Sequence, residues 1–158
     1  MKTVVDTSAL VALLNPDETH NQRASELLMR AYSDGAVVVA PVTYTELGAD
    51  PYFQTSDELD AFLDDTGIRI EEPNSDALFA AGDAFRTYLD RRGEQLQCSE
   101  CGAEATFECP DCEASVTARQ HVPAEFLIGA LAAEQADRLL TFDGGFFETY
   151  FRLDLLAF

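Results

Sequence analysis

Short apolar runs alternate with longer segments of helical periodicity along this chain. Apolar runs at residues 2–5 (KTVV), 36–41 (AVVVAP) and 138–142 (RLLTF) are typical of buried strands, and 67–70 (GIRI) and 153–158 (LDLLAF) predict two more. We expect helices where apolar side chains recur every three or four positions, over residues 7–15, 18–32, 43–47, 56–65, 75–92 and 123–135. Short strands that alternate with helices predict an α/β fold, a three-layer domain with a mostly parallel central sheet.

One segment interrupts this pattern. Between about Gly93 and Ala118 the helical periodicity stops, and this stretch contains every cysteine of the chain. The chain has 158 residues, a length typical of one domain. We therefore interpret residues 94–118 as an insertion within a single domain that spans residues 1–158.

The cysteines form two CxxC pairs, and seven residues separate Cys98 and Cys101 from Cys109 and Cys112. Each pair can present two thiolates from a tight turn, and four thiolates provide the tetrahedral site that Zn²⁺ prefers. Two local disulfides or a redox pair are the alternatives. The doubled motif favours zinc, and four sulfur ligands would close the site, so we expect a structural role for the metal.

Charge is strongly unbalanced, with 29 acidic and 10 basic residues and a formal net charge of −19. The acids are spread along the chain, Lys2 is the only lysine, and 47% of the residues are hydrophobic, so the acidity does not indicate disorder. We favour adaptation to concentrated salt, as in a halophilic archaeon, because a Debye length of about 3 Å at 1 M salt screens surface repulsion. The alternative is an acidic protein of an ordinary cytoplasm.

Two classes of protein are disfavoured. No apolar run approaches the roughly 20 residues that span a bilayer, and the first apolar stretch contains Asp6 and lacks a small-residue cleavage site. We therefore expect a cytoplasmic protein without a membrane partner. Scarce positive charge also argues against a nucleic-acid binder that depends on a broad basic surface.

Four separated carboxylates are candidates for chemistry. Asp6 and Asp143 each follow a predicted strand, and sites in parallel sheets form beyond the carboxyl ends of the strands. Glu46 lies in the helix after the second strand, and Glu125 lies in the first turn of the helix after Pro123. Carboxylates that meet need a cation to offset their repulsion, and oxygen ligands suit Mg²⁺ or Mn²⁺.

Each acid also has a structural explanation. Thr43-x-x-Glu46 matches a capping box, and Glu125 would interact favourably with a helix dipole. Asp6 could cap the first helix, and Asp143-Gly-Gly matches an ordinary turn. Taken singly, the residues leave both interpretations open.

Three segments together resemble a known family. VVDTSALVALL, TYTEL and AEFLIGALAAEQADRLLTFDGGFFETYF are similar to the PIN domain, and more narrowly to the VapC-type ribonuclease toxins. The resemblance covers nearly the whole chain except the cysteine insertion. It implies a Rossmann-like sheet, a metal-dependent endoribonuclease, a homodimer, and a VapB-type antitoxin whose C-terminal tail covers the acidic site.

The resemblance also implies roles for individual residues. The acids of its motifs are expected to be catalytic, and they are Asp6, Glu46, Glu125 and Asp143. Asp6, Asp143 and Glu125 are the expected Mg²⁺ or Mn²⁺ ligands. The hydroxyls of Ser8 and Thr141 are expected to contact phosphate or water.

The sequence departs from the family at two positions. Glu125 stands where the family usually has an aspartate, and Leu131 stands where related toxins often have a histidine. The longer Glu125 side chain ranks below Asp6 and Asp143 as a direct metal ligand.

The leading hypothesis is the toxin of a VapBC pair that hydrolyses RNA phosphodiester bonds with bound Mg²⁺ or Mn²⁺. Two rivals stay open: a non-catalytic RNA- or protein-binding adaptor that uses the cysteine pairs, and a housekeeping RNA-processing nuclease of the same fold. Arg119 and Arg138 are candidate contacts to the RNA backbone, and ordinary surface residues are the equal alternative. We expect His121 to cap the helix before Pro123 and His20 to lie in an exposed loop.

Overall fold

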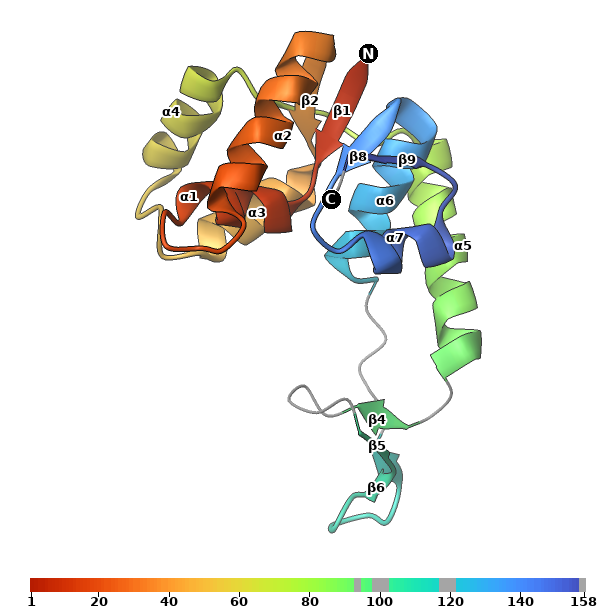
Figure 1. Ribbon diagram of the computed structural model, residues 1–158. Coiled ribbons are helices and arrows are strands. Elements are labelled where there is room, and N and C mark those ends of the chain that lie inside the picture. Colours follow the sequence, from red (N-terminus) through yellow and green to blue (C-terminus); the bar gives the residue numbers. More distant parts are fainter. Residues whose placement is uncertain (93–94, 98–102, 117–121, 157–158) are drawn as a thin grey trace.

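A five-stranded parallel sheet forms the centre of the molecule (Figure 1). The computed structural model describes residues 1–92, 95–97, 103–116 and 122–156. The strand order is β3-β2-β1-β8-β9. These strands are β1 (Lys2–Val5), β2 (Ala36–Val39), β3 (Arg69–Ile70), β8 (Arg138–Leu140) and β9 (Asp154–Leu156).

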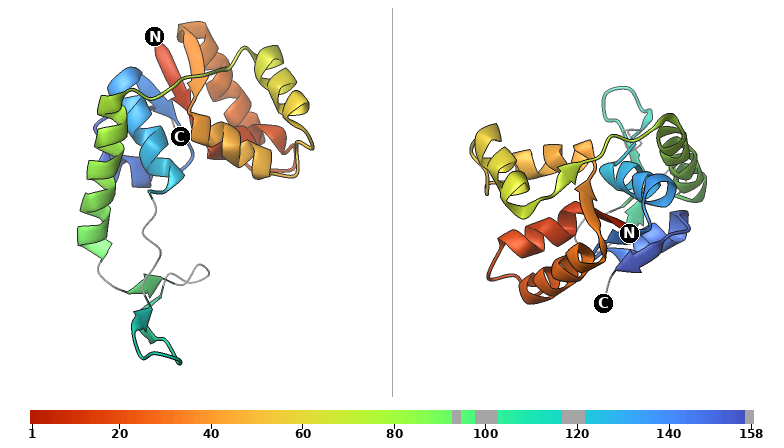
Figure 2. Two further views of the ribbon diagram at one scale, coloured as in Figure 1. Left: turned by 180° about the vertical axis from the view of Figure 1, so that it is seen from behind. Right: turned by 90° about the horizontal axis from the view of Figure 1, so that it is seen from above.

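Helices cover both faces of this sheet (Figure 2). Helices α1, α2 and α4 pack on one face, while α6 and α7 pack on the other and α5 packs against α6. The seven helices of the described chain are α1 (Thr7–Leu14), α2 (Asn21–Asp34), α3 (Pro41–Ala49), α4 (Ser56–Thr66), α5 (Ser75–Arg92), α6 (Ala124–Gln135) and α7 (Gly144–Tyr150). The parallel sheet between two helical layers confirms the predicted α/β architecture.

Alternation along the strands explains why both faces are apolar. Successive side chains of a strand point to opposite faces, so Val5 and Leu140 pack with α1 and α2, whereas Val4 and Leu139 pack with α6 and α7. All four side chains are at most 1% exposed. A sheet buried on both faces needs continuous apolar runs, and this requirement made the strands recognisable in the sequence.

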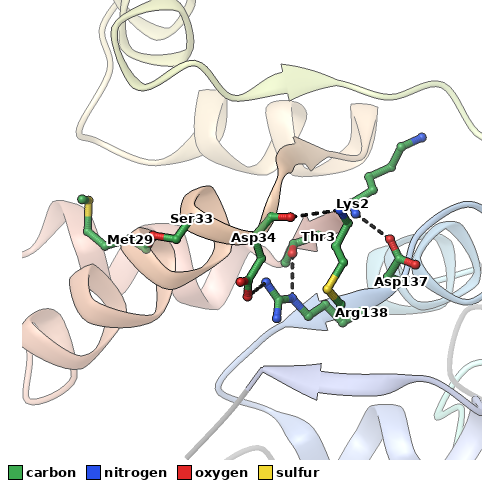
Figure 3. Close-up of polar contacts among 8 residues, drawn as sticks. Lys2, Thr3, Met29, Ser33, Asp34, Asp137 and Arg138 are labelled. Carbon is green, nitrogen blue, oxygen red and sulfur yellow. Dashed lines mark hydrogen bonds and ion pairs between the residues drawn. The ribbon is translucent and has the colours of Figure 1, made fainter.

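The amino ends of β1 and β8 are fastened by a buried arginine (Figure 3). Arg138 is 7% exposed; its Nε donates to Thr3 Oγ1 (2.9 Å) and its Nη2 donates to Asp34 Oδ2 (2.7 Å). Nearby, the Lys2 amide donates to Asp137 Oδ2 (2.6 Å). Arg138 therefore joins β1, β8 and the end of α2, and the prediction that it contacts RNA on the surface is wrong.

Two element predictions need correction. Helix α3 begins at Pro41 and not at Thr43, and β2 ends at Val39, because proline suits the first turn of a helix and cannot donate within a sheet. Asp143-Gly-Gly is not an isolated turn: it begins α7, with Asp143 at the N-cap position.

Between α5 and α6 the described residues form two small antiparallel pairs. β4 (Leu96–Gln97) pairs with β5 (Glu104–Ala105), and β6 (Phe107–Glu108) pairs with β7 (Ser115–Val116). Figure 1 shows β4, β5 and β6 beyond the C-terminal end of α5, apart from the main sheet. No helix in the described ranges combines the length and the apolar character needed to cross a membrane.

Candidate active site

Asp6 lies where β1 ends and α1 begins. Its backbone N–H donates to the carbonyl of Leu140 (2.9 Å), which ties the end of β1 to the end of β8. Its Oδ1 accepts the Thr7 N–H (2.8 Å), so Asp6 caps α1 as predicted. The side chain is nevertheless 6% exposed, and burial of a carboxylate is costly unless other groups satisfy it.

Two hydroxyls satisfy the second oxygen of Asp6. Ser8 Oγ donates to Asp6 Oδ2 (2.6 Å), and so does the buried Thr141 Oγ1 (2.9 Å). Thr141 Oγ1 in turn accepts the backbone N–H of Asp143 (3.0 Å), which connects the Asp6 network to the loop after β8. Ser8 Oγ also accepts the backbone N–H of Phe142 (3.3 Å). These bonds fix the orientation of Asp6.

Glu46 faces Asp6 from α3. Its Oε2 accepts a short hydrogen bond from Thr7 Oγ1. Burial raises the pKa of Glu46, and the hydrogen bond from Thr7 lowers it in part. The negative charges of Glu125 and Asp6 raise the pKa of Glu46 further. Glu46 is therefore electrostatically coupled to two acids that are distant in the sequence.

The capping-box interpretation of Thr43 and Glu46 is wrong. The N-cap of α3 is Ala40, so Thr43 lies inside the first turn. Its buried Oγ1 has no hydrogen-bond partner among the described atoms. Glu46 does not reach back to the start of its own helix but accepts from Thr7 of α1. A capping role therefore does not account for Glu46.

Glu125 and Asp143 are both exposed at the same edge of the sheet. Glu125 lies in the first turn of α6 and acts on Glu46 through its charge. Asp143 occupies the N-cap of α7 and makes no side-chain capping bond within the part of the chain that the structure describes. Its backbone is tied to Thr141 and, through this hydroxyl, to Asp6.

These acids fit a divalent cation by the chemistry of their donors. None of the four forms an ion pair with a described lysine or arginine, and their mutual repulsion contributes to the raised pKa of Glu46. Carboxylate oxygens are the ligands that Mg²⁺ and Mn²⁺ prefer. Within the described residues, however, no three His, Cys, Asp or Glu side chains already form a group that could hold a metal ion. A cation would therefore have to draw the acids together.

His20 reaches this region, contrary to the sequence-based prediction of an exposed loop. It occupies the N-cap of α2, is half-buried, and stacks its ring on that of Phe142 with centroids 5.2 Å apart. Phe142 separates Thr141 from Asp143. No local pattern around His20 could have indicated this contact, because it depends on how α2 packs beside β8. Arg119 and His121, also named from the sequence, lie outside the described residues.

The second cysteine pair lies in the tight turn of the β6–β7 hairpin. The Cys109 N–H donates to the Ala114 carbonyl (2.8 Å), and the Glu113 N–H donates to the Cys109 carbonyl (2.8 Å). Hydrogen bonds from the backbone of Asp111 and Cys112 and from the Cys112 side chain lower the pKa of the Cys109 thiol. Cys109 and Cys112 are free thiols, and the described residues contain no zinc site. Cys98 and Cys101 lie outside the described residues.

Comparison with known proteins identifies structural relatives only. No family model and no curated protein matches the sequence. The fold is similar to that of VapBC2 from Rickettsia felis, solved bound to a DNA fragment from its promoter, with 19% identity, a TM-score of 0.62, and coverage of 99% of this chain and 98% of the other.

A second solved structure is VapC20 of Mycobacterium tuberculosis, described as a "Sarcin-Ricin loop cleaving toxin". The identity is 17%, the TM-score is 0.52, and the match covers 95% of this chain and 96% of that one. At these identities the likeness is one of fold. The chain shares its α/β architecture with these two solved structures over nearly its whole length.

Proposed function

We propose that this protein is a metal-dependent endoribonuclease, and more narrowly the toxin of a VapBC pair. One observation carries the proposal: four acids gather at the carboxyl edge of a parallel sheet. The charges of Asp6 and Glu125 both act on Glu46, and Thr141 links Asp6 to the backbone of Asp143. Ligand sites of such sheets lie at this edge. The similarity in fold to VapC20, a "Sarcin-Ricin loop cleaving toxin", supports the same function.

In this proposal Asp6, Asp143 and Glu125 would hold Mg²⁺ or Mn²⁺. The ion supplies charge stabilisation for phosphodiester hydrolysis when it is bound. Ser8 and Thr141 hold the Asp6 carboxylate in one orientation by their hydrogen bonds. Each of these hydroxyls also accepts one backbone N–H, and its second lone pair can accept a hydrogen bond from a water molecule.

Glu46 has the position and the proton affinity of a general base. Its raised pKa makes it a better proton acceptor than an ordinary surface glutamate, and the Thr7 hydroxyl restrains one of its oxygens. The other carboxylate oxygen can accept a proton from the water that attacks the phosphate. Arg138, buried at the opposite edge, takes no part in this chemistry.

The partners follow from the same proposal. An RNA is the substrate, and a VapB-type antitoxin and a second copy of the chain are the expected protein partners. VapBC2 of Rickettsia felis was solved bound to a DNA fragment from its promoter, and its similarity in fold supports the search for an antitoxin. A small gene beside this one that encodes a binding partner would favour a toxin, and its absence would favour a housekeeping RNA-processing nuclease.

The test compares wild type with Asp6→Asn and with the exposed-loop control Asp17→Asn. We expect Mn²⁺-dependent cleavage of a structured RNA in concentrated KCl by wild type and Asp17→Asn. Loss of the Asp6 charge should reduce the rate by at least about 100-fold, the usual effect of removing one charge-stabilising group. Equal rates for all three proteins would contradict the acid-based mechanism.

The second candidate is a non-catalytic adaptor. One observation favours it: among the described residues, no three His, Cys, Asp or Glu side chains lie close enough together to hold a metal ion. Titration with Mn²⁺ separates the two functions. A nuclease should bind Mn²⁺ in a way that depends on Asp6. An adaptor should show no such binding while it retains affinity for RNA or a protein.

We also propose a structural zinc site formed by Cys98, Cys101, Cys109 and Cys112. The support comes from the second pair, where a tight turn holds two free thiols and backbone N–H groups stabilise the Cys109 thiolate. Zinc coordination requires thiolates, and two such turns supply four of them.

A further inference from the structure

A cavity of about 380 Å³ lies among α5, α6, α7 and the segment after α7, and no role has been assigned to it. Two arginines line it, Arg91 from the last turn of α5 and Arg152 from the segment after α7. The chain has only 10 basic residues against 29 acidic ones, so two guanidinium groups at one cavity are a local exception to its charge.

These two arginines lack the acidic partners that three other arginines have. Arg23, Arg86 and Arg138 form ion pairs with Glu26, Asp83 and Asp34 respectively. Within the described residues, by contrast, neither Arg91 nor Arg152 forms an ion pair or a hydrogen bond. Their donors therefore stay available for a ligand from outside the chain.

Aromatic packing restrains Arg91. Its guanidinium carbon lies 5.5 Å from the centre of the Tyr150 ring, and Tyr150 packs edge-on against Tyr88 with centroids 6.0 Å apart. Arg92 lies over the other tyrosine, 5.8 Å from the centre of the Tyr88 ring. When a guanidinium group stacks on an aromatic ring, its N–H groups still point outward in the guanidinium plane. In that plane they can donate two parallel hydrogen bonds to the oxygens of a phosphate.

The acids of the cavity do not cancel this charge. Asp83 is engaged by Arg86 along α5, which leaves Glu134 of α6 as the acid at the cavity without an ion pair among the described residues. Two uncompensated guanidinium groups therefore face one uncompensated carboxylate. The balance favours an anion with more than one oxygen, which a phosphodiester provides.

Helix α7 connects this cavity to the acidic site. Asp143 occupies the N-cap position of this helix, and Tyr150 is its last residue. Its 7 residues span about 10 Å at 1.5 Å per residue. A stacked nucleic-acid strand advances about 3.4 Å per nucleotide, so this length corresponds to about three nucleotides.

We propose that Arg91 and Arg152 bind a backbone phosphate of the RNA substrate, about three nucleotides from the bond that the acids cleave. The inference rests on the proposed nuclease function and adds a substrate-binding site to it. It also accounts for how so acidic a chain binds RNA: attraction is confined to a small pair of guanidinium groups beside the acids and does not extend over a basic surface.

The test measures RNA binding by the full chain with Asp6→Asn as background, so that bound RNA is not cleaved. The protein is titrated into a fluorescein-labelled single-stranded RNA, and binding is measured by fluorescence anisotropy at a series of KCl concentrations. Circular dichroism verifies that the protein is folded at each concentration. The variants are Arg91→Gln, Arg152→Gln and Arg152→Lys. Arg30→Gln on the exposed face of α2 is the matched control, because it removes the same charge away from the cavity.

We expect Arg91→Gln and Arg152→Gln each to reduce the slope of log K against log salt by about 0.7, the value for one lost contact to a single strand. Arg30→Gln should leave this slope unchanged, and Arg152→Lys should preserve it because the positive charge remains. In an Asp6 wild-type background, the two glutamine variants should raise KM with little change in kcat, because the contact is remote from the reacting atoms.

Suppose that wild type cleaves RNA but that Arg91→Gln and Arg152→Gln show the same salt slope as Arg30→Gln. This result would overturn the inference and leave the nuclease proposal intact. If wild type neither binds nor cleaves RNA, both proposals fail. Poly-L-glutamate serves as a carboxylate probe. Variants that lose affinity for this probe but not for RNA would also overturn the RNA assignment and identify the cavity as a contact for an acidic protein.

Discussion

At the scale of single residues, Asp6 combines a structural and a chemical position. One of its oxygens caps α1 through the Thr7 N–H, and the other accepts hydroxyls of Ser8 and Thr141. Thr7 also donates from its side chain to Glu46. The segment Asp6-Thr7-Ser8 therefore orients two acids of the candidate site at once, and this explains why the local capping role and the proposed catalytic role do not compete.

Glu46→Gln should change stability in a pH-dependent way. Burial and the charges of Glu125 and Asp6 raise the pKa of Glu46 in the folded protein. Between the ordinary and the raised pKa the folded chain binds more protons than the unfolded chain, so this group lowers stability as pH rises through that window. Glutamine removes the charge and still accepts from Thr7. Without divalent cations, we expect Glu46→Gln to melt about 1–3 °C higher than wild type at pH 7.

Thermal melts of Glu46→Gln, wild type and the exposed-residue control Glu18→Gln, from pH 7 downward, provide the measurement. The advantage of Glu46→Gln should disappear below the ordinary glutamate pKa of about 4.3, where both forms are neutral. If Glu46→Gln is less stable than wild type at pH 7, or if the difference in melting temperature does not depend on pH, then burial and the neighbouring acids do not destabilise the charged form of Glu46.

At the scale of elements, α7 and the β6–β7 hairpin give the fold its distinctive features. Helix α7 places Asp143 at one end and Tyr150, against Arg91, at the other. The hairpin presents Cys109 and Cys112 from a turn closed by two backbone hydrogen bonds. Strands of two residues each cannot hold such a hairpin by pairing alone, which is the physical reason to expect a metal there.

Cys109→Ser should remove zinc without removing the acidic site. We expect about one zinc per purified wild-type chain and nearly none in the variant, because a three-thiolate site loses much of its affinity. Glu108→Gln in the same hairpin is the control and should retain the metal. Elemental analysis measures the zinc, and Mn²⁺ titration of the same samples should give equal affinities. Wild type without zinc, or a Cys109→Ser variant that keeps it, would contradict the proposed site.

At the scale of the whole molecule, the charge of −19 has few internal partners. The described residues form four ion pairs, and in three of these pairs both side chains are partly or largely exposed. Exposed pairs contribute little to stability, so repulsion among the remaining acids is compensated mainly by solvent ions. Arg138 with Asp34 is the exception, with an arginine side chain that is 8% exposed.

Thermal stability should therefore rise with KCl. Between 0.1 and 2 M KCl we expect the midpoint to increase by about 8 °C, equivalent to roughly 2–4 kcal/mol at this chain length. Differential scanning calorimetry provides the measurement, and sucrose of matched osmolality controls for effects other than screening. A midpoint that is unchanged or falls with KCl would refute the interpretation of the acids as salt adaptation.

Much of the fold was predictable because its signals are local. Continuous apolar runs located β1 and β8, since both faces of the sheet are buried, and apolar side chains at every third or fourth position located the helices α4 to α6. Where signals overlapped, prediction failed: Pro41 began a helix within what looked like a strand, and Asp143-Gly-Gly began α7 where a turn was expected. In both cases glycine or proline fitted two conformations, and tertiary packing selected one.

By itself, the sequence determined which segments along the chain form strands and helices, and it placed Asp6 and Asp143 after strands, because both depend on periodicity over a few residues. The tertiary structure alone decided that Arg138 is buried, that His20 stacks on Phe142, and that Thr7 donates to Glu46. It also brought Arg91 and Arg152 to one cavity. Each of these contacts joins residues far apart in the chain. It therefore depends on the order of the strands within the sheet and on the packing of the helices, which no local pattern encodes.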